Sequence, residues 1–499
     1  MIINTMDLKR AQFPPEVAIV INRLEQAGFA AYAVGGCVRD LLRGEQPYDW
    51  DVATDAKPED IQRVFPESFY TNAFGTVVVQ IGKEFPDAPD NLKEIEVTTY
   101  RVESAYTDSR HPEEVHFVRD IAEDLARRDF TINAMALRWT QGKPELLDPF
   151  CGAADLERHV IKAVGKPDER FTEDALRLMR AVRLATQLDF TIDERTLGSI
   201  KKNAGLLRNI SAERVRDELM KIIALDRAED GVRLLESAGL LHYIIPELEE
   251  GINVAQNKHH IYTVWEHNVR SLGYAVQYHN NADVRLASLL HDIAKPRTKR
   301  GEGEYATFYG HEVVGARMAK EILRRLKFPH HTLDKVVLLI RYHLFYYNVG
   351  EVTESSVRRL VNKVGEENIA DLVALRVAER KGSGTPKAKP YKLRHLEFMV
   401  EKVLRDPISV KTMAVNGSDL MQCLGLASGP KIGLLLNALF EEVLDDSAKN
   451  NKDYLICRAG ELQDLSEDTL RALAQKGKEK MQKREEAELG TIKKKHFVE

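Results

Sequence analysis

The stretch from Val34 to Thr54, V-G-G-C-V-R-D-L-L-R-G-E-Q-P-Y-D-W-D-V-A-T, constrains the fold more than any other part of the chain. The apolar run over 31–34 predicts a strand, and the two glycines after it predict a tight turn. Residues 38–42 predict a helix of one or two turns, and residues 49–52 predict a second strand. The order strand, glycine pair, helix and acidic strand indicates a small α/β domain at the N-terminal end.

The acidic strand carries Asp49 and Asp51, whose side chains are expected on one face because side chains alternate along a strand. Two neighbouring carboxylates repel each other unless a cation lies between them, and Mg2+ takes oxygen ligands of this kind. The glycine pair, Gly35 and Gly36, lets backbone N–H groups approach a polyphosphate. Together these features predict metal-assisted transfer of a nucleotide. Taken alone, the D-x-D pair is better explained by a polar loop and the glycine pair by an ordinary turn, and only the full arrangement favours the catalytic interpretation.

Length and composition set the broad class of the protein. A chain of 499 residues is too long for one core and predicts roughly three or four domains. With 43% hydrophobic and 30% charged residues, the composition is that of a globular soluble protein. The net charge is −5, so an RNA partner would need local clusters of Lys and Arg.

Cysteine usage and apolar runs indicate the compartment. The four cysteines are far apart and form no C-x-x-C pair, which indicates reduced thiols in a cytoplasmic setting and neither a disulfide framework nor a zinc site. No signal peptide is recognised at the N-terminus, and no apolar run reaches transmembrane length, so we expect no membrane association.

A third acidic residue, Glu96, lies in the strand predicted over 93–101. Ile95 and Val97 share the opposite face of this strand. Glu96 therefore either joins the two aspartates or faces solvent as an ordinary strand glutamate.

Three motifs connect the chain to a known family. The arrangement from Gly35 to Asp51 closely resembles the motif G-G-x-V-R-D followed by D-x-D of the class II CCA-adding tRNA nucleotidyltransferase and poly(A) polymerase family. The segment R-R-D-F-T-I-N-A-M-A over 127–136 is similar to a second motif almost letter for letter, and E-D-A-L-R over 173–177 is similar to the nucleotide-selecting motif E-D-x-x-R. The family also carries an acid on the strand of Glu96, which favours a catalytic role for it beside Asp49 and Asp51.

The resemblance assigns nucleotide binding to residues of these motifs, namely Gly35, Gly36, Arg39, Arg128, Asp129, Asn133, Glu173, Asp174, Arg177 and Arg180. Arg128 would contact the triphosphate. Asp129 and Asn133 would lie near the ribose, on one face of a predicted helix because they are four residues apart. The alternative is an ordinary amphipathic helix.

Asp174 and Arg177 fall in a helix predicted over 171–188, with Thr172 as its N-cap. Cytosine and adenine both present an exocyclic amine beside an unprotonated ring nitrogen. By the resemblance, Asp174 would accept from the amine and Arg177 would donate to the ring nitrogen, which selects C and A against U and G. The alternative is a capped helix with an Asp174–Arg177 ion pair.

A histidine-rich region follows. His267 and the adjacent pair His291-Asp292 resemble the H…HD…D ligand set of HD phosphohydrolases, and the last acid corresponds to Glu379. Further histidines lie in Y-G-H-E, at His311, and in R-Y-H, at His343. The resemblance implies a divalent transition metal on His267, His291 and Asp292. The alternative is a degenerate HD domain kept for helical packing.

The predicted fold class is α+β and multidomain, with a small nucleotidyltransferase α/β domain of about five strands before mostly helical domains. The predicted domains are a catalytic head over 1–165, a nucleotide-selecting and RNA-binding neck over 166–250, an HD domain over 255–385 and a C-terminal helical tRNA-binding part over 386–499. A polar loop is expected over 106–118 and a linker over 380–390.

The resemblance implies addition of C, C and A to the 3′ end of tRNA from CTP and ATP, with Mg2+ on Asp49 and Asp51 and release of pyrophosphate. The partners would be tRNA, CTP and ATP, and the chain a monomer or homodimer. Two alternatives stay open: a poly(A) polymerase or a specialised CC- or A-adding enzyme of the same family, and an HD phosphohydrolase acting on RNA ends.

Overall fold

The computed structural model describes residues 13–71, 75–103, 115–140, 143–257, 261–278, 281–345, 347–385, 389–404, 413–445 and 447–498. The Arg110-His111-Pro112 piece of the predicted loop lies outside them. The chain forms two compact units. One holds the chain up to Leu344 together with Ala374–Pro386, and the other holds Phe345–Val373 and the chain from Lys387 onward.

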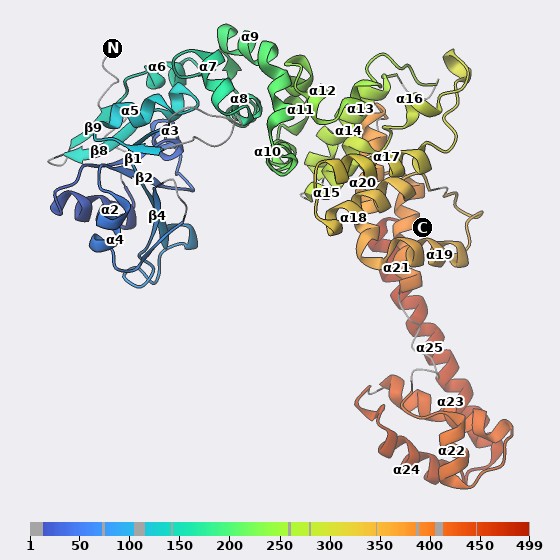
Figure 1. Cartoon of the computed structure of the whole chain (residues 1–499). Helices are drawn as coiled ribbons and strands as arrows, with labels where there is room; N and C mark the ends of the chain where they lie inside the picture. Colours follow the sequence, from blue (N-terminus) through green and yellow to red (C-terminus); the bar gives the residue numbers. More distant parts are fainter. Residues whose placement is uncertain are drawn as a thin grey trace. The chain divides into compact units, whose positions relative to one another are not determined.

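The first unit begins with a mixed sheet, which confirms the predicted α/β head (Figure 1). Its strands are β1 (Ala31–Val34), β2 (Asp51–Thr54), β3 (Ser68–Tyr70), β4 (Thr76–Gln80), β5 (Glu94–Thr99), β8 (Ala136–Thr140) and β9 (Lys143–Leu147). The order across the sheet is β3-β4-β5-β2-β1-β8-β9. The sheet thus has seven strands in the described chain, and the expected number of about five was too low.

Two small strand pairs accompany this sheet: β6 (Arg101–Glu103) with β7 (Val115–Phe117), and β10 (Val160–Ile161) with β11 (Thr191–Ile192). The end of the predicted 106–118 loop is therefore strand β7. The head helices are α2 (Pro15–Gln26), α3 (Gly36–Leu42), α4 (Pro58–Val64), η1 (Asp90–Leu92), α5 (Ile121–Ala126), η2 (Thr131–Asn133) and α6 (Gly152–Glu157).

The acidic strand β2 lies at the centre of the sheet, between β1 and β5. Strand β2 runs antiparallel to β1 and parallel to β5, so Asp51 lies opposite Val34 on one side and Glu96 on the other. Apolar side chains around Val34, Ala53 and Tyr100 form a core cluster of the head. Trp50, which lies between the two aspartates, is also buried. The core thereby holds the start of β2 in place.

The head is followed by α7 (Pro167–Glu173), α8 (Leu176–Leu188), α9 (Glu194–Asn203), η3 (Ala204–Asn209), α10 (Ala212–Ala224), α11 (Ala228–Ser237), α12 (Leu241–Ile244) and α13 (Pro246–Glu249). Two helix predictions were wrong here. Helix α5 ends at Ala126, so Asp129 and Asn133 lie on a bend and a 3-10 turn. The helix expected over 171–188 is interrupted at Asp174, and Thr172 is no N-cap because its hydroxyl donates to the Asp168 carbonyl inside α7.

The histidine-rich region consists of α14 (Val264–Tyr278), α15 (Ala282–Leu290), α16 (Lys295–Thr298), η4 (Gly303–Tyr305), α17 (His311–Arg325), α18 (His330–Tyr342) and α20 (Glu366–Gly382). Helix α20 continues through Gly382, so the start of the linker predicted at Arg380 was wrong. Arg285 of α15 joins this region to α10, since its guanidinium donates to the carbonyls of Ile223, Ala224 and Leu225.

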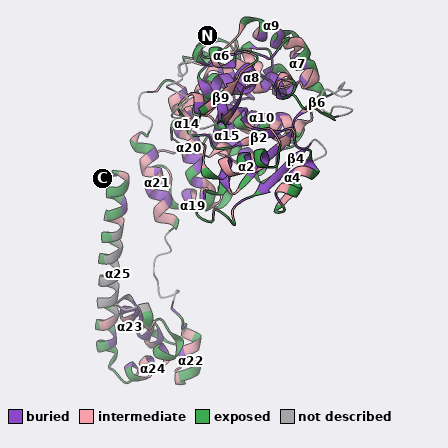
Figure 2. Cartoon of the chain, turned by 90° about the vertical axis from the view of Figure 1, so that its left-hand side faces the viewer, coloured by how far each residue is buried: buried purple, intermediate pink, exposed green. Residues whose placement is uncertain are grey.

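The second unit is helical, with α19 (Glu354–Val364), α21 (Tyr391–Leu404), α22 (Gly417–Leu424), α23 (Pro430–Asp445), η6 (Ser447–Lys449), α24 (Lys452–Leu462) and α25 (Glu467–His496). Leu420, Leu439 and Leu455 are among the buried residues of its core cluster. Figure 2 shows mostly exposed and intermediate residues along the described part of α25. Among the described residues, no helix combines the length and apolar character needed to cross a membrane.

Candidate active site

Two acidic side chains meet at the start of the central strands. Asp51 and Glu96 are partners on the parallel strands β2 and β5, so their side chains emerge on the same face. Asp49 is exposed and precedes strand β2, which begins at Asp51 and not at residue 49 as predicted. Burial, followed by the carboxylates of Glu96 and Asp49, raises the pKa of Asp51, while Arg128 opposes this rise. The three predicted carboxylates therefore act on one another electrostatically.

Gly35 lies between this acidic group and Arg128. Its φ of +78° is one that L side chains rarely adopt. A Cβ atom at this position would be 2.9 Å from Nη1 of Arg128 and 3.8 Å from Oδ2 of Asp51. Gly35 therefore leaves the space that brings the backbone, the guanidinium and the carboxylate together. Gly36 begins helix α3, and a Cβ there would contact the Arg39 guanidinium at 3.6 Å.

Arg128 is anchored by a buried carboxylate that the sequence interpretation did not single out. Its Nη2 donates to Asp124 Oδ2 at 3.1 Å, and Arg127 donates to the other oxygen at 2.8 Å. Burial opposes ionisation of Asp124, but the two arginines outweigh it and lower its pKa. Nε of Arg128 is buried and has no hydrogen-bond partner in the described part of the chain. Asp124 therefore fixes the guanidinium through Nη2, while Nη1 lies against Gly35.

A chain of hydrogen bonds runs from α3 to α8. Nη1 of Arg39 donates to Asn133 Oδ1 at 2.9 Å, and Asn133 Nδ2 donates to Asp129 Oδ1 at 3.2 Å. Arg180 then donates to Asp129 Oδ2 through Nε and Nη2, at 2.9 and 2.6 Å. Burial would raise the pKa of Asp129, but Arg180 lowers it to about 2. Asp129 and Asn133 meet as predicted, although a 3-10 turn and no α-helix places them together.

The predicted base-selecting residues have partners other than each other. Arg177 donates to Glu173 Oε2 at 2.9 Å and to the Arg127 carbonyl at 2.9 Å. Asp174 accepts from the Leu176 N–H and from Arg214 Nη2, at 3.1 and 2.8 Å. The alternative of an Asp174–Arg177 ion pair was therefore wrong. The bend at Asp174 separates the two side chains.

Arg214, from α10, was not predicted as a site residue. Its Nη1 is buried without a hydrogen-bond partner among the described residues. The sequence signal was available, because Arg214 lies in the first turn of an amphipathic helix, in the segment S-A-E-R-V-R-D-E-L. What the sequence does not contain is the packing of α10 against α8, which brings Arg214 to Asp174.

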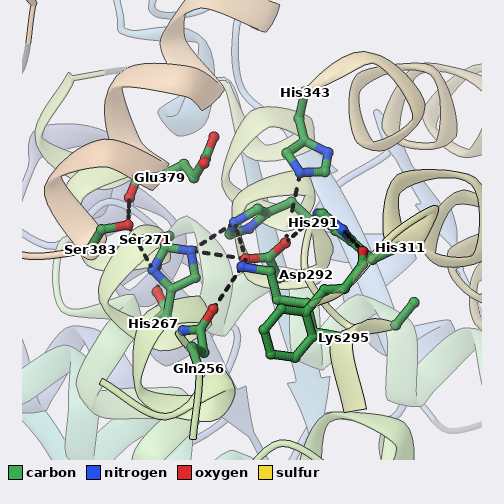
Figure 3. A network of polar contacts seen from close by, with 12 residues as sticks. Gln256, His267, Ser271, His291, Asp292, Lys295, His311, His343, Glu379 and Ser383 are labelled. Carbon is green, nitrogen blue, oxygen red and sulfur yellow. Dashed lines mark hydrogen bonds and ion pairs between the residues drawn. The ribbon is translucent and has the colours of Figure 1, made fainter. Parts of the chain in front are cut away.

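A second polar cluster lies in the HD region (Figure 3). Asp292, at 1% exposure, is surrounded by histidines from four helical segments. His267 and His291 approach its Oδ2 with Nε2 at 3.1 and 3.2 Å. His311 and His343 approach its Oδ1 with Nε2 at 3.2 and 3.7 Å. His311 and His343 were noted in the sequence but not predicted as ligands.

Backbone carbonyls fix the orientation of three of these histidine rings. Nδ1 of His291, His311 and His343 lies 2.8, 2.6 and 2.7 Å from the carbonyls of Ser288, Phe308 and Ile340. Each carbonyl accepts the Nδ1 proton, so each Nε2 is directed toward Asp292. Burial lowers the pKa of His267, and it lowers the pKa of His343 to about 4. Neutral imidazoles of this kind are common metal ligands.

Glu379, the predicted final acid, is held by an arginine. Nη1 of Arg376 lies 2.5 Å from both carboxylate oxygens. Burial opposes ionisation of Glu379, yet Arg376 and then His343 lower its pKa to about 2. In the part of the chain that the structure describes, two sets of three residues have ligand atoms close enough to hold a metal ion: His267, His291 and Asp292, and Asp292, His311 and His343. Glu379 belongs to neither set.

Three family models match successive parts of the chain. The poly A polymerase head domain matches residues 31–162, the probable RNA and SrmB-binding site of polymerase A matches 189–252, and the HD domain matches 264–379.

Relatives and solved structures agree with these matches. The chain is 47% identical over 231 residues to a CCA-adding enzyme of Limosilactobacillus reuteri. The aligned region covers 46% of this chain and 54% of the relative, so the chain matches about half the length of that protein. It is 33% identical to the CCA-adding enzyme of Levilactobacillus brevis, over 88% of this chain and 95% of the relative.

The crystal structure of the Bacillus stearothermophilus CCA-adding enzyme in complex with CTP is 29% identical, covers 90% of this chain and 98% of that one, and superposes with a TM-score of 0.57. The match with the Levilactobacillus brevis enzyme extends through both the head and the helical parts. The chain therefore belongs to the family of CCA-adding enzymes, a family of nucleotidyltransferases.

Proposed function

We propose that the protein adds C, C and A to the 3′ end of tRNA, without a nucleic-acid template, from CTP and ATP and with release of pyrophosphate. The observation that carries the proposal is the juxtaposition of Asp51, Glu96, Gly35 and Arg128 near the start of strands β2 and β5. It combines carboxylates for a cation with a glycine and an arginine for phosphate. Similarity to CCA-adding enzymes supports the choice of tRNA as the acceptor.

The acidic group suits Mg2+ because it offers only oxygen ligands. Burial, and after it the carboxylates of Glu96 and Asp49, raise the pKa of Asp51, and a divalent cation would relieve the repulsion between the carboxylates. We propose that Asp49, Asp51 and Glu96 hold this ion, which when bound activates the terminal 3′-hydroxyl and neutralises charge on phosphate. The protein itself supplies fixed positions, because β2 and β5 hold Asp51 and Glu96 in register.

The phosphates would be bound by Gly35, Gly36, Arg39 and Arg128. Arg128 suits this role because Asp124 fixes its guanidinium through Nη2 while Nη1 lies beside the Gly35 turn. Asp129 and Asn133 would read the ribose. Their carboxylate and amide are held rigidly between Arg39 and Arg180, so little side-chain entropy would be lost when a nucleotide binds.

Base selection would fall to Glu173, Asp174, Arg177 and Arg180, on either side of the α7–α8 bend. Asp174 would accept from the exocyclic amine of C or A, and Arg177 would donate to the neighbouring ring nitrogen. Glu173 orients Arg177 through a 2.9 Å hydrogen bond, and Arg214 orients Asp174 at 2.8 Å. Asp174 and Arg177 are thus each held by an oppositely charged side chain, which favours a fixed hydrogen-bonding pattern toward the base.

Incorporation of labelled CTP and ATP into tRNA that ends at its discriminator base tests the proposal. A CCA-adding enzyme extends this tRNA by C, C and A and then stops. Extension by two C residues alone identifies a CC-adding enzyme, and extension only of tRNA that already ends in CC identifies an A-adding enzyme. A long adenosine tail identifies a poly(A) polymerase. No extension of any acceptor contradicts nucleotidyl transfer.

A second function, hydrolysis of a phosphate ester by the HD region, is favoured by the converging His267, His291 and Asp292. Imidazole nitrogens suit a divalent transition metal better than Mg2+. When bound, such an ion would supply a hydroxide for hydrolysis. Phosphate release from a 2′,3′-cyclic nucleotide tests this activity, and its loss in His291→Ala with nucleotide addition intact would assign it to the HD region.

The predicted four-part division at 165, 250 and 385 remains a proposal, as do the cytoplasmic location and a monomeric or homodimeric state. The division is supported by the order of the family matches, with the head before the RNA-binding region and the HD region after it.

A further inference from the structure

We propose that a surface ribbon of the HD region binds unpaired RNA by stacking its bases on two exposed tyrosines. The ribbon consists of residues 300–309, between α16 and α17, and the side chains that would contact RNA are Arg300, Tyr305 and Tyr309. The proposal goes beyond nucleotide addition and beyond hydrolysis by the histidine cluster, because these three side chains belong to neither site.

Backbone hydrogen bonds hold the ribbon in a defined conformation. The N–H of Arg300 donates to the Thr307 carbonyl and the N–H of Thr307 donates to the Arg300 carbonyl, both at 2.9 Å, so the two residues form an antiparallel pair. Side chains of directly opposed residues lie on one face, so Arg300 and Thr307 point the same way. The turn between them contains Gly301 and Gly303, whose positive φ angles favour glycine.

The inner face of the ribbon is packed against the HD region. Ala306 and Phe308, on either side of Thr307, are 2% and 8% exposed. The Phe308 ring has its centre 5.6 Å from Nζ of Lys295, and the Phe308 carbonyl lies 2.6 Å from Nδ1 of His311. Because side chains alternate along an extended segment, the face that carries Thr307 is the outer one. The ribbon is therefore anchored on one side and presents its other side to solvent.

Two tyrosines flank this outer face. Tyr305 and Tyr309 are 85% and 83% exposed, more than any other large hydrophobic residue in the described part of the chain. They lie on either side of Thr307, and Arg300 lies opposite Thr307, so the three exposed side chains belong to one surface. Isolated exposed apolar residues are common, whereas two such rings on one anchored segment indicate a binding surface. Bases of unpaired RNA stack on aromatic rings of this kind, largely irrespective of sequence.

Arg300 supplies the charge that a phosphate backbone requires. Two neighbouring cations are already neutralised, since Arg297 pairs with Glu250 at 2.6 Å and Lys299 pairs with Glu302 at 2.8 Å. Arg300 is exposed, and no carboxylate among the described residues pairs with it. An unpaired guanidinium beside two aromatic rings favours an anionic strand with stacking bases over an uncharged protein surface.

Binding of a fluorescein-labelled ten-residue oligouridylate to the full-length protein tests the proposal, because this RNA forms no duplex. Fluorescence anisotropy gives the dissociation constant. Tyr305→Ala and Tyr309→Ala should each weaken binding by at least about fivefold, as expected when a base loses its stacking partner. Tyr305→Phe and Tyr309→Phe keep the aromatic ring and should bind like the unmodified protein.

Arg300→Gln should reduce the salt dependence of binding. Loss of one phosphate contact lowers the slope of log Kd against log salt by about 0.7 for a single strand. Two matched controls should leave the affinity and the slope unchanged. They are Arg324→Gln, at an exposed position near the other end of α17, and Tyr278→Ala, at an exposed tyrosine that ends α14.

Crosslinking locates the bound RNA, because the head and neck are proposed to contact RNA as well. The same oligonucleotide carrying 4-thiouridine is irradiated with the protein, and trypsin then releases the ribbon as the peptide over 301–317. An adduct on this peptide supports the proposal. Adducts on other peptides alone, with unchanged affinity in folded Tyr305→Ala and Tyr309→Ala proteins, would overturn it.

Sedimentation analysis of the same variants tests the other use of such a surface. Unchanged RNA binding with a loss of self-association would overturn the proposal and assign the ribbon to a contact between two copies of the chain. Addition of C, C and A to tRNA is measured in parallel, and the tyrosine variants should keep the kcat of the unmodified protein. Since the ribbon contributes no residue to the acidic group of the head, failure of this proposal is distinguishable from failure of nucleotide addition.

Discussion

Arg180 of α8 donates two hydrogen bonds to one oxygen of Asp129, at 2.9 and 2.6 Å, and so ties the helical neck to the head domain. Asp129 is 8% exposed. The pair continues through Asn133 to Arg39 beside the glycine turn. A single line of hydrogen bonds therefore connects the proposed phosphate-binding, ribose-binding and base-selecting elements.

We expect Arg180→Met to destabilise the protein, because it leaves a buried carboxylate without its charged partner. The loss in unfolding free energy should be on the order of 1–3 kcal/mol, the cost of a hydrogen bond to a charged group. Urea unfolding at pH 7 measures it. Arg227→Met serves as the control, since Arg227 forms ion pairs with Asp230 and Asp189 at the surface and should cost at most about 1 kcal/mol. Equal losses in both variants would refute the special role of Arg180.

The pH dependence of the unfolding free energy should show the contribution of the ionised Asp129 carboxylate. Its pKa in the folded protein is lowered from 3.8 to about 2, with burial opposed by Arg180. Its contribution is therefore fully present above about pH 4 and is lost as the pH falls toward 2, and it amounts to about 2 kcal/mol. Unfolding by urea between pH 5.5 and 3 should show a shallower decline in Asp129→Asn than in the unmodified protein. Asp217→Asn, at an exposed position, should follow the unmodified protein.

The acidic group predicts a different kind of loss. Asp51→Ala and Glu96→Gln should reduce nucleotide addition by at least about 10²-fold, since removing charge stabilisation worth several kcal/mol has this effect. Binding of tRNA should change little. Glu94→Gln is the control, because Glu94 lies on the same exposed face of β5 two residues earlier. Addition at nearly full rate by a folded Asp51→Ala protein would refute the proposed magnesium site.

Much of the head site was predictable because its determinants are local. The glycine pair, the strand alternation around Trp50 and the apolar flanks of Glu96 each follow from a few consecutive residues. The parallel pairing of β2 with β5 could not be read from the sequence. It answers the question whether Glu96 faces solvent or joins the aspartates, because it places Glu96 beside Asp51. The count of strands was missed because short edge strands such as β3 carry a weak pattern.

The errors arose where tertiary contacts override helical periodicity. The segment around Asp129 has helix-like spacing, but its carboxylate accepts from the Phe130 N–H and from Arg180, which favours a bend. Asp174 interrupts the next helix by accepting from the Leu176 N–H and from Arg214. His311 and His343 were not assigned because their convergence on Asp292 depends on how α17 and α18 pack. None of these long-range pairs is encoded by spacing.

A buried arginine at the junction of neck and HD region gives a stability prediction. Arg285, at 3% exposure, donates to three carbonyls at the end of α10. Arg285→Met should lower the unfolding free energy by about 2–4 kcal/mol, because those carbonyls lose a charged donor. Arg297→Met removes an exposed ion pair with Glu250 and should cost at most about 1 kcal/mol. Differential scanning calorimetry compares the two, and equal melting temperatures would contradict this assignment.

Nucleotide choice offers the most discriminating prediction. If Asp174 and Arg177 read the base edge, Asp174→Ala removes the acceptor for the exocyclic amine, so kcat/KM for CTP and ATP should both fall by the equivalent of about 1–3 kcal/mol. Discrimination against UTP and GTP should relax in parallel. Arg177→Ala should act in the same direction.

Arg214→Ala should weaken selection less than Asp174→Ala, because Arg214 holds the reader in position through its 2.8 Å contact and would not itself touch the base. Glu213→Gln, at the exposed neighbouring position on α10, is the matched control. All four nucleotides are assayed on tRNA lacking its CCA end. The purely structural interpretation predicts lower stability with an unchanged ratio of C and A over U and G. An unchanged ratio in a well-folded Asp174→Ala protein would therefore return the α7–α8 bend to a structural role, because a missing hydrogen bond to the base must alter relative and not only absolute rates.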